Sequence, residues 1–523
     1  MTEEQGAPLD IKFQQRFSKN LISNVVYFVL NVIIGLALVP FFLDTLGEAA
    51  YGLIPLATSL TSYVTLIIDA VNGAISRYLT IDLQRGDITK ANETFNTAVF
   101  GTLGIILILV PISLLVAGLA PSIFNIGTES PTAVFLLFAL VFGSILIRAW
   151  SSNFMVTLFA YNRLDLRNYV NVANLLVQVV VVILLFWIIG PSLPLVGFSY
   201  FVAAVAALAL SYILSRNLCP FLTISVEKFS KSRLREILSI TGWTTIIKIG
   251  LLFQGHIALI AVNILFGDVA GTEYSLTLMW SALLLTIAGL LTNCFTPMIY
   301  SYRAKNNRDG IIKFTSFTVK ITTLFMALLI GLVCIFASQL LTFWVGNEYA
   351  ALATLMGFVV IPVIFLIQSS CCAPINAAYV RVRMPAIANI VVGVFNLILV
   401  FALPIIFNIG MYGIALAIGF SNFILFGGFS PIYGAYILKA PLFTFVKPAL
   451  PGYLTLAVFL VAGSILTYFV YIDSIVELII AGCIISGIYG LFLCKILLNK
   501  EERILIRSVL PKMVARFIPT WLL

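Results

Sequence analysis

The sequence has few charged residues. Lys, Arg, Asp and Glu make up 10% of the 523 residues, and hydrophobic residues make up 61%. A soluble domain contains about a quarter charged residues, and its single core could not bury this much apolar surface. The composition therefore excludes an ordinary soluble protein and indicates one embedded in a membrane.

Sequence motifs for common cofactors are also absent. There is no G-x-x-x-x-G-K-[ST] segment, which excludes an ATP-binding P-loop, and no H-E-x-x-H pair or Cys/His cluster for a metal. The seven cysteines have no zinc or redox spacing, and we expect the adjacent Cys371 and Cys372 to be packing residues. We therefore expect no cofactor and no metal. We also expect no enzymatic activity, because the short gaps on the outer side leave little room for a catalytic domain.

Lys and Arg are absent from every second gap between the apolar stretches. Those gaps hold only acidic charges, such as Asp44, Glu129 and Glu348, whereas the other gaps and both tails hold the bases. The positive-inside rule places the basic gaps and both termini in the cytoplasm, which requires an even number of spans. The sequence thus predicts a multi-pass protein of the cell membrane. Its net charge of +9 would face anionic lipid headgroups and not nucleic acid.

About fourteen apolar stretches have the length needed to cross a bilayer, which predicts an all-α polytopic membrane protein. The expected helices are 20–42, 51–76, 93–119, 132–161, 169–189, 195–215, 241–266, 273–300, 313–340, 351–379, 387–407, 411–438, 451–470 and 475–498. We divide the chain into a six-helix lobe (1–215), a basic cytoplasmic loop (216–240), a second six-helix lobe (241–438), two additional helices (439–498) and a basic amphipathic cytoplasmic tail (499–523).

The two six-helix lobes contain similar segments in the same order. Gly127-Thr128-Glu129 precedes the fourth helix as Gly346-Asn347-Glu348 precedes the tenth, and Ala160-Tyr161 and Ala378-Tyr379 end those helices. Because six is even, both copies would enter from the cytoplasm, which predicts a parallel repeat around a central cavity with alternating access. Chance similarity between apolar segments is the alternative.

Charged residues inside the predicted spans are the first candidates for a site. They are Asp69, Arg148, Lys248, Lys320 and, at an edge, Arg77. Each costs about 2.5–3.5 kcal/mol at a helix centre, so such residues usually have a function. For Lys320, we favour a long side chain that reaches the headgroups.

Helical spacing aligns these charges with other polar residues. The four stripes are Asn20, Asn24, Tyr27 and Asn31; Thr58, Ser62, Thr65, Asp69, Asn72 and Ser76; Ser144, Arg148, Ser151 and Ser152; and Thr241, Thr244, Thr245, Lys248 and Gly255, with His256 at the margin. We favour a wet cavity for the stripes that contain charges, and hydrogen bonding between helices for Ser and Thr alone. His256 is as well explained by a neutral, hydrogen-bonded histidine as by a proton carrier.

Several short motifs resemble the Wzx-type polysaccharide-biosynthesis flippases of the multidrug/oligosaccharidyl-lipid/polysaccharide (MOP) superfamily. They are Phe17-Ser18-Lys19-Asn20, the Gly47-x-x-x-Tyr51-Gly52 turn, and Arg77 followed by Arg85-Gly86-Asp87. The six-plus-six repeat with two extra helices is similar to that family over nearly the whole chain.

The resemblance implies export of a polyprenyl-diphosphate-linked oligosaccharide, an O-antigen or polysaccharide precursor, to the outer leaflet. It implies a monomer in contact with membrane lipids and with polysaccharide assembly proteins. We expect substrate-binding residues at Arg148, Lys248, Arg77, Asn24, Asn31 and Asn72, and ion or proton coupling at Asp69 and His256.

Two other functions are left open. A multidrug antiporter of the same superfamily would bind cations, and it typically needs an acid in its cavity. The first predicted helix has asparagines and no acid, and bases outnumber the one deep acid, which favours an anionic substrate. A membrane polymerase or glycosyltransferase would need a larger loop with carboxylates or histidines.

Overall fold

A computed structural model describes residues 9–255, 257–469, 472–499 and 502–503. The described chain is helical and contains no β-strand. Within these residues, thirteen helical segments are long and apolar enough to cross a membrane. The prediction of an all-α polytopic membrane protein is therefore confirmed. The remaining predicted span corresponds to α2, a 37-residue helix in which several side chains lie outside the described set.

The chain forms two compact units, residues 1–272 and 273–523. The first contains α1 (Leu9–Leu46), α2 (Glu48–Gln84), α3 (Ile88–Ile123), α4 (Pro131–Ala160), α5 (Leu164–Ile188), α6 (Leu193–Leu218), the short helix η1 (Val226–Lys228), α7 (Lys231–Gly255), α8 (Ile257–Phe266) and the first turn of α9 (Asp268–Ala304).

The second unit contains the rest of α9, followed by α10 (Arg308–Ile335), α11 (Ala337–Val345), η2 (Asn347–Leu352), α12 (Ala353–Val360), α13 (Val363–Ala378), α14 (Arg383–Phe407), α15 (Met411–Asn422), η3 (Phe423–Phe429), α16 (Ser430–Ile437), η4 (Lys447–Ala449), α17 (Leu450–Phe469), α18 (Ile475–Phe492) and η5 (Leu493–Leu497). Two predicted spans are interrupted here. Pro362 separates α12 from α13, and a π-helical segment around Gly427 and Gly428 separates α15 from α16.

Two of the motifs singled out in the sequence are helix boundaries. Gly86 has φ = 71°, a conformation that glycine adopts without strain, and Asp87 caps α3 by accepting a hydrogen bond from the backbone N–H of Lys90. This hydrogen bond lowers the pKa of Asp87 and favours its charged form. Gly47, at the start of α2, has φ = 83°. The Gly47 motif therefore marks the turn before α2, and the Gly86-Asp87 motif marks the turn between α2 and α3.

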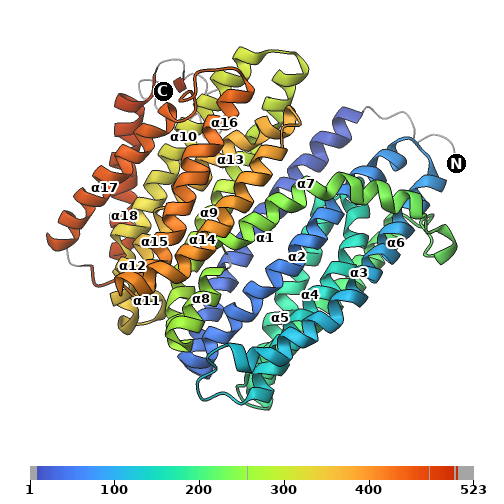
Figure 1. Ribbon diagram of the computed structural model, residues 1–523, viewed down its shortest axis with the longest axis horizontal. Coiled ribbons are helices and arrows are strands. Elements are labelled where there is room, and N and C mark those ends of the chain that lie inside the picture. Colours follow the sequence, from blue (N-terminus) through green and yellow to red (C-terminus); the bar gives the residue numbers. More distant parts are fainter. Residues whose placement is uncertain (1–8, 256, 470–471, 500–501, 504–523) are drawn as a thin grey trace. The chain divides into compact units, whose positions relative to one another are not determined.

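In the first unit, α4 packs against α2, α3 and α6, and α5 packs against α1 and α6. Figure 1 shows these helices running alongside one another. A buried cluster joins Ile75 and Leu79 of α2 to Phe95 of α3 and Phe154 of α4. This apolar packing holds α2, which carries Asn72, against α4, which carries Arg148.

The segment between α6 and α7 is docked on α3. The amide groups of Asn92 and Asn96 bond to the backbone of Phe221, Thr223 and Ser225 at 2.8–3.1 Å. At the start of α7, Arg233 contacts Asp82 of α2 and lies over the ring of Tyr78 at 4.7 Å.

Because of these contacts, α7 belongs to the first compact unit. α8 packs there too, because Asn263 exchanges hydrogen bonds with the backbone and side chain of Asn125. The predicted lobe boundary at 216–240 describes the sequence repeat and remains a prediction. The division by packing lies later, within α9.

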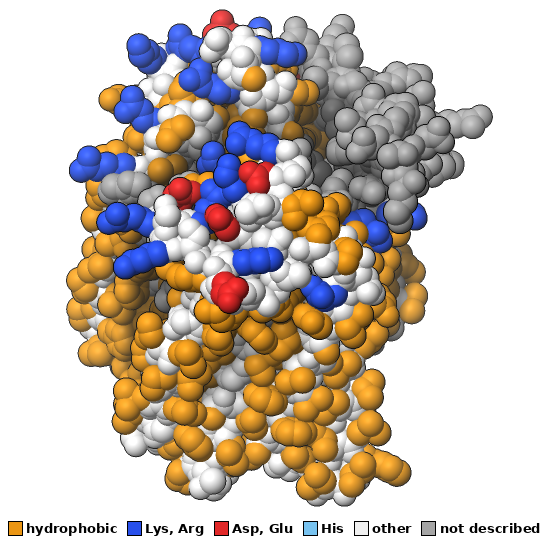
Figure 2. Space-filling model, turned by 90° about the vertical axis from the view of Figure 1, so that its right-hand side faces the viewer, with side chains coloured by type: hydrophobic (Ala, Val, Ile, Leu, Met, Phe, Trp, Pro, Cys, Tyr) orange, Lys and Arg blue, Asp and Glu red, His pale blue; other side chains and the backbone are white. Residues whose placement is uncertain are grey.

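On the face shown in Figure 2, Lys and Arg gather with a few acidic residues over the upper part, and hydrophobic side chains cover the lower part. Large apolar side chains are exposed along the helices, for example Trp187 at 84% and Ile188 at 69%. An apolar surface next to a charged face is the pattern of a membrane-spanning protein.

Candidate functional site

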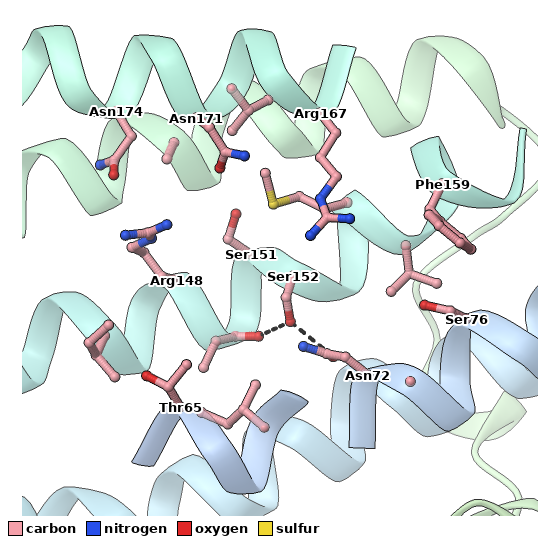
Figure 3. Close-up of a pocket in the computed structure, with 18 of the residues that line it drawn as sticks. Thr65, Asn72, Ser76, Arg148, Ser151, Ser152, Phe159, Arg167, Asn171 and Asn174 are labelled. Atoms are coloured by element: carbon pink, nitrogen blue, oxygen red, sulfur yellow. Dashed lines mark hydrogen bonds between the residues drawn. The ribbon is translucent and has the colours of Figure 1, made fainter. Parts of the chain in front are cut away.

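A cavity of about 630 Å³ lies within the first unit, in the range of about 300–1,000 Å³ that is typical of ligand pockets. Helices α1, α2, α4, α5, α6 and α7 contribute to its wall. The residues that line it are Tyr27, Thr65, Ile68, Asn72, Gly73, Ser76, Ile145, Arg148, Ala149, Ser151, Ser152, Met155, Val156, Phe159, Arg167, Val170, Asn171, Asn174, Ala207 and Lys248. Figure 3 shows the polar side chains of α2, α4 and α5 turned toward the same space.

The floor of the cavity is fixed by a hydrogen bond between two helices. The Ser152 hydroxyl donates to the backbone oxygen of Ala149 at 2.5 Å and to the Asn72 side-chain oxygen at 3.1 Å. Asn72 and Ser152 were each predicted from the period of a polar stripe, and the structure brings the two stripes into contact. The side-chain nitrogen of Asn72 is then available to a ligand as a donor, and its oxygen retains a second lone pair.

Three bases line the cavity, namely Arg148 on α4, Arg167 on α5 and Lys248 on α7. The side chains of Arg148 and Arg167 are exposed and, in Figure 3, point into the open space. Neither guanidinium forms an ion pair with a residue that the structure describes. By contrast, the nearby Arg163 is paired with Asp165 at 2.9 Å, and Arg233 is paired with Glu236 at 2.8 Å.

No carboxylate is found among the described side chains that line the cavity. Three positive charges therefore face a cavity with low-dielectric helical walls, and their field attracts anions and repels cations. Asn171 and Asn174 add amide groups on the α5 wall, and in Figure 3 Asn174 lies beside Arg148. Chemically, the arrangement suits a ligand with negative charge and many hydroxyl groups.

The other predicted residues lie elsewhere or outside the described set. Asn24 accepts a hydrogen bond of 2.7 Å from Asn168, so it joins α1 to α5. Asn31 and Arg77 are exposed, and neither is among the residues lining the cavity. The side chain of Asp69 and the whole of His256 lie outside the described residues, so their predicted coupling roles remain predictions.

Lys320 has a partner that the sequence reasoning did not find. Its Nζ lies 2.8 and 3.0 Å from the carboxylate oxygens of Glu502, and both side chains are largely buried. The prediction that this lysine reaches the headgroups did not anticipate the pair. Most of the predicted tail, 499–523, lies outside the described residues.

Sequence reasoning missed Arg167, Asn171 and Asn174 as site residues. They lie three or four positions apart on α5, a spacing that places them on one helical face. The predicted helix began at residue 169, which left Arg167 in a loop. A search for periodicity that continued two residues further would have found all three.

Comparison with known proteins agrees with the fold. No protein-family model matches the chain. The uncharacterized membrane protein EpsK of Bacillus subtilis (strain 168) is 27% identical over 502 residues, which cover 94% of this chain and 97% of EpsK.

Two solved transporter structures are also similar. The lipid II flippase MurJ in an inward closed conformation has a TM-score of 0.66 at 15% identity, covering 91% of this chain and 99% of MurJ. An inward-facing multidrug resistance MATE family transporter of the MOP superfamily has a TM-score of 0.62 at 11% identity, covering 82% and 95%.

At such identities the likeness concerns the fold. The Wzx-type assignment suggested by the sequence motifs remains a prediction. This helical membrane chain has the fold of the MATE and MurJ transporters.

Proposed function

We propose that the protein is a flippase that moves a polyprenyl-diphosphate-linked oligosaccharide from the cytoplasmic to the outer leaflet of the cell membrane. The observation that carries this proposal is the cavity lined by Arg148, Arg167 and Lys248, with no carboxylate among its described side chains. The transporter fold supports the transport part of the proposal.

The diphosphate is the part of this substrate that Arg148 and Lys248 suit. An arginine guanidinium donates two parallel hydrogen bonds to phosphate oxygens, and lysine adds a compact charge. The amides and hydroxyls of Asn72, Asn171 and Ser151 would contact sugar hydroxyls. The lipid tail would stay in the bilayer, because only the headgroup needs a polar path.

Export of an organic cation fits the same fold less well. A cation would be repelled by three bases, and the α1 segment from Asn20 to Phe42 has no acidic residue. An enzyme acting on the same lipid would need a general acid or base, and the described cavity wall has neither a carboxylate nor a histidine.

Membrane potential is the driving force that we propose. A diphosphate linkage carries about two negative charges, and each charge moved across the membrane is worth about 2.3 kcal/mol per 100 mV. An inside-negative potential therefore drives the substrate outward, by about 4–5 kcal/mol per 100 mV if the charges are not neutralised. If transport ignored the potential, required an ion gradient and lost that requirement in Asp69→Asn, the driving force would instead be ion exchange.

The test is transport by the purified protein in proteoliposomes, with a fluorescent polyprenyl-diphosphate glycan as substrate. We expect Arg148→Ala and Lys248→Ala each to lower the initial rate at least about tenfold, the loss of a charge-assisted hydrogen bond. Lys90→Ala is the matched control, because Lys90 is exposed and forms only a surface pair with Asp87. Full activity of Arg148→Ala would contradict the proposal. So would transport of an organic cation by the protein in place of the polyprenyl-diphosphate glycan.

A further inference from the structure

The three bases of the cavity do not lie at one point. Arg148 lies twelve residues before the end of α4, whereas Arg167 lies three residues after the start of α5. Figure 3 shows Arg148 beside Asn174, and Arg167 beyond Asn171 toward Phe159. Asn174 and Arg167 are seven residues apart on α5, which corresponds to about 10 Å along the helix axis. Arg148, beside Asn174, and Arg167 therefore lie toward different ends of this wall.

Arg167 has no acidic partner among the described residues, although an acid lies two positions away. The Asp165 carboxylate receives three hydrogen bonds from Arg163, at 2.9, 3.0 and 3.3 Å, and its backbone N–H donates to Asn20. The short segment Arg163–Arg167 therefore contains one satisfied base and one that faces the cavity unpaired. Arg163 is the natural structural comparison for Arg167.

Building on the function proposed above, we propose that Arg167 forms a second anion-binding point, which takes an acidic substituent on the glycan. A carboxylate of a uronic acid and a phosphate on a sugar share the chemistry that a guanidinium recognises. A single diphosphate held at Arg148 is too compact to reach a base two helical turns away. The amide of Asn171 lies between the two points, where a neutral sugar would bridge them.

This arrangement would make Arg167 a specificity-determining residue. A neutral glycan would leave its charge without a partner in a confined cavity, whereas an acidic glycan would satisfy it. The two arginines should therefore have separable effects. Arg148 would affect all lipid-diphosphate substrates, and Arg167 only those with an acidic sugar.

The experiment measures binding and flipping of four synthetic polyprenyl-diphosphate glycans by the reconstituted protein. They carry a neutral sugar, a uronic acid, the methyl ester of that uronic acid, or a sugar phosphate. The variants are Arg167→Ala, Arg167→Gln, Arg167→Lys, Arg148→Ala and, as the structural control, the double variant Arg163→Gln/Asp165→Asn, which removes the neighbouring ion pair without freeing a carboxylate. Because the measured quantity is the ratio between acid and ester, a general loss of folded protein cancels.

We expect the unmodified protein to prefer the acid over its ester by tenfold or more. Arg167→Ala and Arg167→Gln should remove this preference while keeping binding of the neutral glycan, and Arg167→Lys should keep part of it. The double variant Arg163→Gln/Asp165→Asn should leave the ratio unchanged. Comparison of the uronic acid with the sugar phosphate identifies which acid the point takes.

An unchanged ratio in Arg167→Ala would overturn this inference, and so would an equal loss for all four substrates, which would make Arg167 part of the diphosphate point. The proposed function fails differently. In that case none of the four glycans binds, or Arg148→Ala has no effect on any of them.

Discussion

Asn20 shows how a single amide fixes the end of a helix in this protein. Its side chain donates to the backbone and side-chain oxygens of Asn162 at 3.1 and 3.2 Å, and accepts from the backbone N–H of Asp165 at 3.0 Å. These bonds tie α1 to the turn between α4 and α5. Asn20 belongs to the motif on which the family resemblance rested, and its role in the structure is to position the helix that carries Arg167.

We therefore predict that Asn20→Ala destabilises the first unit. The change leaves the partly buried backbone groups of Asn162 and Asp165 without this partner, at a cost of about 1 kcal/mol or more. Thermal unfolding in detergent measures the effect. Asn31→Ala, an exposed position on the same helix, should change stability by no more than about 0.5 kcal/mol. Equal effects of the two substitutions would contradict this reading of Asn20.

The Lys320–Glu502 pair gives a second prediction for single residues. Lys320→Met should leave Glu502 as a largely buried charge without its partner, at a cost on the order of 3 kcal/mol. The double variant Lys320→Met/Glu502→Gln should regain most of that stability, because no charge is left unpaired. A double-mutant cycle based on unfolding temperatures measures the coupling. Strictly additive effects would show that the pair does not form.

Among the elements, the segment between α6 and α7 is held against α3 mainly by side-chain hydrogen bonds. The side-chain amide of Asn92 and that of Asn96 each donate to a backbone C=O of the segment and accept from a backbone N–H. They satisfy backbone groups that would otherwise need a partner in regular secondary structure. The ion pair between Arg233 and Asp82 then fixes the start of α7. The helix that carries Lys248 is thus anchored at one end on α2 and α3.

Replacing Asn96 with Ala should release this segment locally. The backbone of Thr223 and Ser225 loses two bonds of 2.8 Å, so we expect faster hydrogen exchange over 221–226, by about tenfold for each 1.4 kcal/mol of lost protection. Hydrogen-exchange mass spectrometry measures it. Lys228→Ala removes a solvent-exposed contact with Thr223 and should have little effect. Unchanged exchange in Asn96→Ala would mean that other contacts hold the segment.

For the whole molecule, the charge pattern predicts which ends of the helices face the cytoplasm. Cysteines introduced at Thr128 and Glu348 should react from outside intact cells with an impermeant maleimide, and one at Lys231 should react only after permeabilisation. Lys231 is preferable to Arg233, because Arg233 is engaged with Asp82 and a cysteine there would be poorly accessible. Labelling of the Lys231 site in sealed cells would contradict the predicted cytoplasmic location of the basic segments.

The native cysteines decide the background of this measurement. Cys483 is exposed on α18, but it lies near the middle of this span, where an impermeant reagent in water does not reach it. Cys219 is buried, and burial raises its pKa to about 11, so it should stay unreactive near neutral pH. Its lack of labelling in the parent protein after permeabilisation is an internal check on the structure around the end of α6.

The sequence could not predict where the helices break. Pro362 and Pro404 both lie within predicted spans, yet α14 continues through Pro404 while α12 ends just before Pro362. Proline removes the same backbone donor in both places. Whether the helix is kinked or interrupted depends on the neighbours that satisfy the freed carbonyl groups, and these come from distant parts of the chain.

The sequence by itself determined the membrane class, most of the spans and two of the three cavity bases. These features depend on apolar length, charge placement and helical period, which are local along the chain. The tertiary structure alone decided which polar stripes meet. It placed Asn72 against Ser152, turned Asn24 toward Asn168, and left Arg167 facing the cavity after Arg163 had taken Asp165. Pairing among polar groups depends on contacts between helices far apart in sequence, so no periodicity within one helix could reveal it.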